Sequence, residues 1–179
     1  MIAAPTRRYD YVTVPSEIYR RSFSTIRSEA DLSTMPGELH AVAVRMIHAC
    51  GDVGLVNDLA FHPLLALAAR TALTGGATIL TDTQMLAAGV TRRRLPADNE
   101  VVCLLDDPRA SELATQWGTT RSAAAVSLWA DRLEGAVVAI GNAPTALFHL
   151  LELIADGAPR PAAIIGIPVG FVGSAESKI

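Results

Sequence analysis

A histidine near the end of a predicted helix is the residue of this sequence best suited to proton transfer. His48 lies in the segment Arg45-Met-Ile-His-Ala-Cys-Gly51, where apolar residues at helical spacing precede a glycine that ends the helix. One interpretation is structural, because the negative end of the helix dipole stabilises a histidine in the last turn. The other is general acid or base catalysis, because histidine exchanges a proton near neutral pH. The residues alone leave both interpretations open.

Two loops that follow apolar runs are suited to binding an anionic ligand. Residues 136–140 lead into Gly-Asn-Ala-Pro at 141–144, and residues 162–167 lead into a Gly-rich loop at 168–174. An apolar run that ends in glycine and proline before a helix is typical of the turn after a parallel strand. Ligands bind at this end of open α/β sheets, and free N–H groups at a helix amino end favour negative charge. We therefore expect backbone N–H groups at 142–145, and at 119–122 before another predicted helix, to bind carboxylates.

The motifs of several other ligand classes are missing from the sequence. Gly166, Gly170 and Gly173 do not have the spacing of the dinucleotide fingerprint, and no Gly-Lys-Ser/Thr phosphate loop occurs. No two histidines lie four residues apart, no cysteines form a Cys-x-x-Cys pair, and no serine lies in a nucleophile elbow. We expect neither a metal site nor a cofactor.

Composition restricts the class of protein. Half of the residues are hydrophobic and 18% are charged, which suits strands that are covered on both faces. The net charge of −3 argues against a general nucleic-acid binder, and the uncharged run at 135–151 is broken too early to cross a membrane. Cys50 and Cys103 are isolated and no secretory signal is visible, so we expect reduced thiols and a cytoplasmic protein.

An alternation of helices and strands must hold these residues in place. Apolar runs predict strands at 77–80, 101–105, 136–140 and 162–167. Helical spacing predicts helices at 15–30, 37–50, 63–73, 83–88, 109–117, 121–133 and 146–154, and leaves 52–62 ambiguous. Four apolar strands separated by helices predict right-handed crossovers and a three-layer α/β/α sandwich with a mostly parallel sheet.

Six segments together resemble the precorrin-8X methylmutase family of cobalamin biosynthesis. They are Ile18-Tyr-Arg-Arg-Ser-Phe23, Arg45-Met-Ile-His-Ala-Cys-Gly51, Gly89-Val-Thr-Arg92, Thr120-Arg-Ser-Ala-Ala-Ala125, Ala139-Ile-Gly-Asn-Ala-Pro-Thr-Ala-Leu147 and Pro168-Val-Gly-Phe-Val-Gly-Ser174. The resemblance implies a flavodoxin-like sheet, a homodimer, and an isomerase that converts precorrin-8X to hydrogenobyrinate by moving one methyl group from C-11 to C-12. Such an intramolecular shift needs no metal or redox cofactor. It needs a site that holds the ring and supplies one proton.

The resemblance also implies roles for individual residues. His48 would move the proton, and Ser22 would contact the substrate. The tetrapyrrole carries many carboxylates around an apolar ring, and Arg121 can bind one of them through two N–H groups. Arg21 can do the same, although it is equally well interpreted as a solvated helix residue.

The predicted substrate contacts continue in the loops. Thr120, Asn142 and Thr145 are either substrate contacts or ordinary helix caps. Gly170 is a further substrate-binding position, in a loop whose Val169 and Phe171 can cover the ring.

Alternatives remain at the level of the whole chain. We expect 1–179 to be a single methylmutase domain that lacks the family's C-terminal strand and helix, which would leave 162–167 at an edge or paired with another chain. Competing functions are a non-catalytic corrinoid carrier, an inactive truncated family member and a flavodoxin-like nucleotide or flavin binder. The sequence does not separate a metal-free substrate from a cobalt-bearing one.

Overall fold

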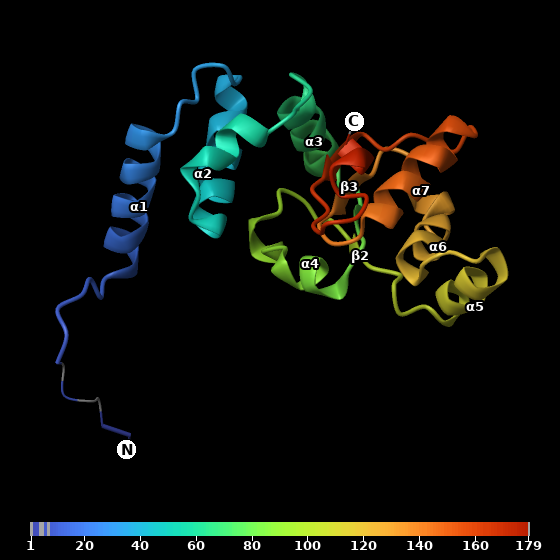
Figure 1. The fold of residues 1–179 in the computed structure, drawn as a ribbon, viewed down its shortest axis with the longest axis horizontal. Coiled ribbons are helices and arrows are strands. Elements are labelled where there is room, and N and C mark those ends of the chain that lie inside the picture. The colour runs from blue at the N-terminus through green and yellow to red at the C-terminus, as the bar shows by residue number, and fades with distance from the viewer. Residues whose placement is uncertain (1, 4–5, 7, 179) are drawn as a thin grey trace. The chain divides into compact units, whose positions relative to one another are not determined.

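The chain divides into two compact units in the computed structural model, which describes residues 2–3, 6 and 8–178. The first unit is Met1–Pro63 and the second is Leu64–Ile179. Figure 1 shows helices in the first unit and a sheet surrounded by helices in the second. Each unit has its own apolar core.

Two helices packed against each other form most of the first unit. α1 spans Pro15–Glu29, α2 spans Gly37–Cys50, and the 3₁₀ helix η1 follows at Val53–Asp58. Gly51 ends α2 with a φ of 73°, a left-handed conformation that glycine adopts without strain. The core of this unit consists of the buried side chains of Ile26, Val44 and Ile47.

A four-stranded parallel sheet forms the centre of the second unit. Its strands are β1 (Ile79–Thr81), β2 (Val101–Val102), β3 (Val137–Ile140) and β4 (Ala163–Gly166), in the order β2-β1-β3-β4. In the register, Ile79 lies opposite both Val101 and Val137, and Val137 lies opposite Ala163. Because all pairs are parallel, the carboxyl ends of the strands lie along one edge of the sheet. The strand order is that of flavodoxin-like sheets, as expected.

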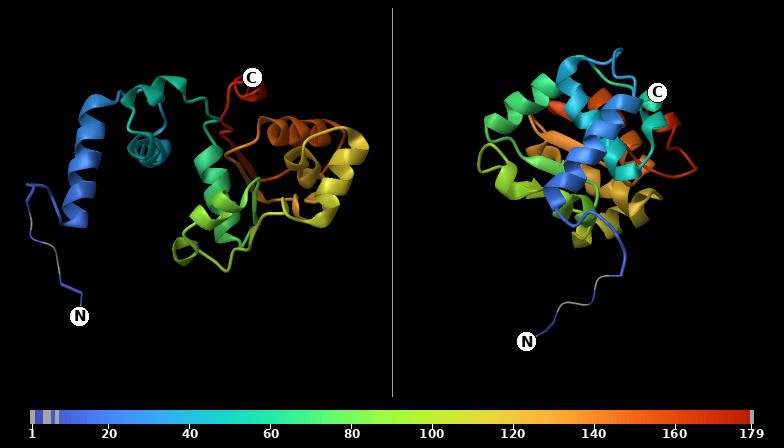
Figure 2. Two further views of the ribbon diagram at one scale, coloured as in Figure 1. Left: turned by 60° about the horizontal axis from the view of Figure 1, so that its bottom comes forward. Right: turned by 90° about the vertical axis from the view of Figure 1, so that its left-hand side faces the viewer.

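Helices on both faces complete the predicted three-layer sandwich. They are α3 (Leu65–Thr74), α4 (Gln84–Gly89), η2 (Arg92–Arg94), α5 (Pro108–Trp117), α6 (Arg121–Ser127), η3 (Ala130–Arg132), α7 (Pro144–Ala155) and η4 (Glu176–Lys178). Figure 2 shows α3 on one side of the sheet and α6 and α7 on the other. The larger core lies between the sheet and these last two helices, where Leu80, Val138 and Leu150 have no exposed area.

One predicted helix is shorter in the structure than its apolar pattern indicates. The spacing predicts a helix over 121–133, but α6 ends at Ser127. The N–H groups of Leu128 and Trp129 then donate to the carbonyls of Ala125 and Val126, three residues back. This tighter 3₁₀ turn buries the Trp129 side chain to 1% exposure in the core, so tertiary packing overrides the helical pattern.

Other boundaries also shift. The strand predicted at 101–105 is limited to Val101–Val102, because the chain turns at 104–107, where the Asp107 N–H donates to the Leu104 carbonyl. β4 lies at the edge of the sheet, and Ile165 and Ile167 are exposed there. None of the helices in the described part of the chain has the length and hydropathy of a membrane-spanning segment.

Candidate active site

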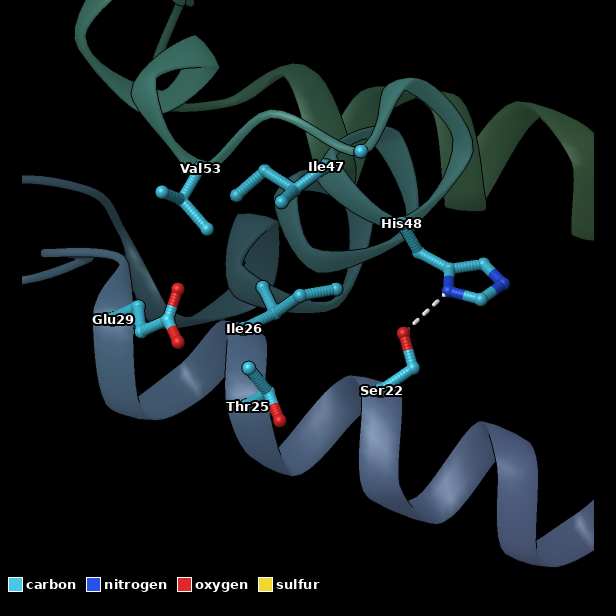
Figure 3. A pocket seen from close by; sticks show the side chains of 8 residues that line it. Ser22, Thr25, Ile26, Glu29, Ile47, His48 and Val53 are labelled. Atoms are coloured by element: carbon cyan, nitrogen blue, oxygen red, sulfur yellow. Dashed lines mark hydrogen bonds between the residues drawn. The ribbon is translucent and has the colours of Figure 1, made fainter. Parts of the chain in front are cut away.

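The histidine and serine singled out from the sequence form a hydrogen-bonded pair in the first unit. His48 lies in the last turn of α2, and its Nδ1 is 2.7 Å from Oγ of Ser22, which lies on α1. Both side chains are half-buried. Figure 3 shows the second ring nitrogen on the far side from Ser22. Because the hydroxyl occupies Nδ1, Nε2 is the nitrogen that a ligand can reach.

Two aromatic side chains of α1 fix the plane of the imidazole. The ring centroid of His48 lies 5.5 Å from that of Tyr19 and 5.2 Å from that of Phe23, which meets it edge-on. The Phe23 ring in turn packs against the guanidinium of Arg45, 5.6 Å from its centroid. These contacts and the Ser22 hydroxyl hold the histidine in one orientation, which a proton donor or acceptor requires.

A small cavity lies beside this pair. It has a volume of about 280 Å³. The residues that line it are Ser22, Thr25, Ile26, Glu29, Ile47, His48, Gly51 and Val53. Pockets for drug-sized ligands measure roughly 300–1,000 Å³, so this cavity can take a peripheral group of a macrocycle but not the ring itself.

The two predicted threonines of the second unit contact each other. The hydroxyls of Thr120 and Thr145 are 2.7 Å apart, which joins the amino ends of α6 and α7. Thr120 Oγ1 also accepts a hydrogen bond from the Ala123 N–H at 3.1 Å. Thr120 is therefore a helix cap, as one of the two interpretations predicts, and both threonines remain exposed.

An aspartate that the sequence reading missed occupies the turn before α7. Asp82 directly follows β1 and is 3% exposed. Its carboxylate accepts the N–H groups of Gly141, Asn142 and Ala143 at 3.1, 2.9 and 2.9 Å. The expectation that the N–H groups of Asn142 and Ala143 bind a substrate carboxylate is therefore wrong, because the protein's own carboxylate already accepts them. In the sequence, the signal for this role of Asp82 is a single acidic residue that follows an apolar run.

The two candidate arginines differ in their surroundings. Arg21 donates to Glu17 Oε1 at 2.6 Å on the exposed surface of α1, which supports its interpretation as a solvated helix residue. Hydrogen bonds from Arg20 and then Arg21 lower the pKa of Glu17 to about 2. Arg121 is exposed and has no ion pair within the described part of the chain, so its guanidinium can reach a ligand.

The loop after β4 lies beside the turn that carries Asn142. The Val169 N–H donates to the Asn142 carbonyl at 3.4 Å. Gly170 follows with a φ of 132°, a backbone conformation that residues with a side chain rarely adopt. Val169 and Phe171 are exposed, and Phe171 has its full side chain in solvent. Asn142 and Gly170 are thus brought together at the carboxyl edge of the sheet.

A second histidine site, also missed from the sequence, lies on α7. His149 Nε2 is 2.7 Å from Ser127 Oγ, whereas its Nδ1 is 3.9 Å from Glu152, too far for a hydrogen bond. The imidazole stacks on Trp117 with 6.2 Å between ring centroids. A cavity of about 280 Å³ adjoins it, lined by Thr119, Ala123, Thr145, Phe148, His149 and Glu152.

Comparison with known proteins decides the family. Residues 17–179 match the family model described as precorrin-8X methylmutase. The precorrin-8X methylmutase of a Sinorhizobium species is 60% identical over 170 residues, 95% of this chain and 81% of its own length. The enzyme of that name from Pseudomonas aeruginosa is 57% identical over 169 residues, 94% and 81% of the two chains. The chain belongs to the precorrin-8X methylmutase family.

A solved precorrin-8X methylmutase supports the same assignment through its fold. The structure from Thermus thermophilus superposes with a TM-score of 0.79 at 40% identity, covering 91% of this chain and 79% of that one. The family match includes every candidate site residue, from Arg21 to Gly170. Methylmutase membership therefore applies to both units.

Proposed function

We propose that this methylmutase converts precorrin-8X to hydrogenobyrinate by moving one methyl group from C-11 to C-12, with His48 transferring the proton that accompanies the shift. Substrate and product of such a step are isomers, so no atom is gained or lost. The chain's family membership carries the isomerase activity. The single observation behind the role of His48 is its 2.7 Å hydrogen bond to Ser22, which leaves Nε2 for the ring.

Ser22 would control which tautomer of His48 is present. If its hydroxyl donates to Nδ1, the neutral ring carries its proton on Nε2, which can then only donate a hydrogen bond; if Nδ1–H donates to the hydroxyl, Nε2 is a base in the neutral ring and an acid once it is protonated. The serine hydroxyl can rotate to suit either tautomer. Tyr19 and Phe23 keep the ring plane fixed in either case.

Binding of the tetrapyrrole would rest on polar and apolar contacts of different residues. Arg121 is the main carboxylate ligand, because no ion pair within the described chain competes for its guanidinium. Arg21 contributes less, since Glu17 already binds it. The exposed side chains of Asn142 and Thr145 and the exposed loop around Gly170 provide the remaining contacts.

A corrinoid carrier is the competing function, and turnover separates the two. The test is to incubate the purified protein with precorrin-8X and record the visible spectrum and the mass of the pigment. An isomerase changes the chromophore at constant mass, with the new spectrum accumulating beyond one equivalent of protein. A carrier binds the pigment without converting it, which would refute the proposal.

Turnover of the metal-free and the cobalt-bearing ring, measured side by side, tests which of the two is the substrate. The two relatives at 57% and 60% identity carry the name of the metal-free substrate, which supports precorrin-8X over its cobalt-bearing counterpart for this chain. We expect higher kcat/KM for the metal-free ring. Equal or better turnover of the cobalt form would contradict this choice.

Two further proposals concern the protein's state in the cell. We expect a homodimer, which sedimentation equilibrium of the purified chain would test, and a cytoplasmic location, which fractionation of the native host would test. Neither nucleic acid nor a membrane is expected as a partner.

Absence of flavin absorbance in the purified protein would argue against the flavin-binding alternative.

A further inference from the structure

A buried carboxylate holds the turn that carries two of the proposed substrate contacts. Asp82 Oδ1 accepts the Gly141 N–H at 3.1 Å, and Oδ2 accepts those of Asn142 and Ala143 at 2.9 Å each. Asp82 is 3% exposed, and of its three bonds the one to Ala143 is buried and the other two are partly buried. Three successive backbone donors therefore converge on one side chain, which directly follows the neighbouring strand β1.

This arrangement fixes the turn that leads into a helix without a side-chain cap. The residue before α7, Ala143, has no side chain that can cap, and Pro144 at the first helical position has no N–H group to satisfy. The donors left over at a helix amino end need an acceptor, and negative charge is favoured there. Asp82, 60 residues before Asn142 in the chain, accepts the N–H of Ala143 at the cap position and those of the two residues before it, whereas the Ala146 N–H donates to the Ala143 carbonyl.

We propose that Asp82 is a positioning residue for substrate binding: it fixes the turn that presents Asn142 and Thr145, and it keeps substrate carboxylates off the N–H groups of Gly141, Asn142 and Ala143. The turn then contacts an uncharged polar part of the ring, and the acidic side chains bind elsewhere. This inference rests on the proposed substrate role of Asn142 and Thr145.

Hydrogen bonds from the same turn explain why its position matters. The Asn142 carbonyl accepts the Val169 N–H at 3.4 Å, and the Thr145 hydroxyl is 2.7 Å from that of Thr120. The turn is thus joined to the loop of Gly170 and to the amino end of α6. A shift of the turn would displace several proposed contacts together.

The first test uses the wild-type protein. NMR couplings through hydrogen bonds should link the amide nitrogens of Gly141, Asn142 and Ala143 to the carboxyl carbon of Asp82, both in the free protein and when it is saturated with the ring. Titration with acetate should leave these three amide signals unchanged. Loss of the couplings on ring binding, or acetate shifts at these amides, would overturn the exclusion of substrate carboxylates.

The second test uses Asp82→Asn, which keeps the shape but replaces one acceptor oxygen with an NH₂ group. We expect KM for precorrin-8X to rise ~10-fold, as for the loss of about one hydrogen bond, with kcat little changed. The matched control is Asp107→Asn, which alters a carboxylate at the amino end of α5 that accepts the Arg109 N–H at 3.0 Å. The control should keep the wild-type KM. An unchanged KM in Asp82→Asn would refute the positioning role.

Anion rescue separates positioning from a general loss of structure. In Asp82→Ala, formate can enter the vacated space and accept the same N–H groups, so it should lower KM toward the wild-type value while chloride does not. Absence of rescue in a folded variant counts against the proposal. If neither variant folds, the wild-type couplings decide.

The proposed function fails in a different way. If wild-type protein neither binds nor converts precorrin-8X, the substrate assignment is wrong, whereas the couplings between Asp82 and the turn are measured without any substrate.

Discussion

His48 and Ser22 are 26 residues apart in the chain but share one hydrogen bond. The helical spacing of 37–50 placed His48 in the last turn of α2, where the structure has it. Its partner could be named only through the family resemblance, because neither composition nor spacing predicts which residue of α1 faces α2. The roles of both residues in turnover remain predictions.

Replacing Ser22 tests whether that hydrogen bond matters for the chemistry. Ser22→Ala removes the hydrogen-bond partner of Nδ1, so nothing on α1 selects between the two tautomers of the imidazole. A neutral hydrogen bond contributes about 0.5–1.5 kcal/mol, so we expect kcat to fall up to ~10-fold. The control is Ser127→Ala, which removes the corresponding hydroxyl at His149 and should leave kcat unchanged. Steady-state kinetics that show equal kcat in all three proteins would contradict the prediction.

Arg121 is predicted to bind substrate through charge. Arg121→Ala should weaken ring binding by about 1.5–3 kcal/mol, the range for a hydrogen bond to a charged group. The loss should shrink for a ring with amidated side chains, since charge is what the guanidinium recognises. Titration calorimetry with both forms of the ring makes the measurement.

The control for this variant is Arg109→Ala, because Arg109 is an exposed arginine that already pairs with Asp107. Its binding constants should equal those of the wild type. An equal loss in Arg121→Ala for acid and amide rings would instead identify Arg121 as a structural residue.

At the level of helices and strands, the ends of the elements position the site. Thr120 caps α6 and also contacts Thr145 at the start of α7. The sequence predicted the helices that follow both residues, and left open whether the threonines cap or bind. The contact between them depends on how α6 packs against α7, which a local pattern does not encode.

Thr120→Ala should destabilise the second unit. Loss of a threonine cap costs about 1 kcal/mol of unfolding free energy, and the contact to Thr145 is lost as well. Thr120→Ser keeps the hydroxyl and should stay close to the wild type. Chemical denaturation followed by circular dichroism compares the three proteins, and equal midpoints would show that the cap contributes nothing.

The first turn of α1 has a predicted pH dependence. Hydrogen bonds from Arg20 and then Arg21 lower the pKa of Glu17 from 4.5 to about 2 in the folded chain. A carboxyl group whose pKa is lower in the folded chain stabilises the fold at pH values above its pKa in the unfolded chain. This contribution is therefore complete above about pH 4.5 and is lost as the pH falls toward 2. Because the group is exposed, the effect on unfolding is small.

Titration of the Glu17 carboxyl carbon by NMR checks this pH dependence. Arg20→Ala should raise its pKa more than Arg21→Ala, because Arg20 donates two hydrogen bonds and Arg21 donates one. The opposite order would show that the ion pairs differ in solution.

At the scale of the whole molecule, the sequence predicted the sandwich and its parallel strands because apolar runs alternate with helices. It did not predict Asp82, since a buried acid after β1 is understood only when its three donors from the turn after β3 are known. It also overestimated the helix after Arg121, because burial of Trp129 selects a 3₁₀ turn. Contacts between residues far apart in the sequence determine both the role of Asp82 and the end of α6.

The prediction of a single domain over 1–179 stays untested, with two compact units in the structure.

The most direct test of the account is turnover of precorrin-8X by His48→Ala, compared with the wild type and with His40→Ala from the same helix. Among the described contacts, His40 forms no hydrogen bond with a proposed site residue. Its Nε2 lies 2.9 Å from the carbonyl oxygen of Met35. We predict that His48→Ala binds the ring but converts it ~10²–10⁴-fold more slowly, seen as an equally slowed change of the pigment's spectrum at constant mass, because proton transfer acts in the transition state. The wild type and His40→Ala should convert it fully. Methyl migration at near-wild-type rate in His48→Ala would contradict the account.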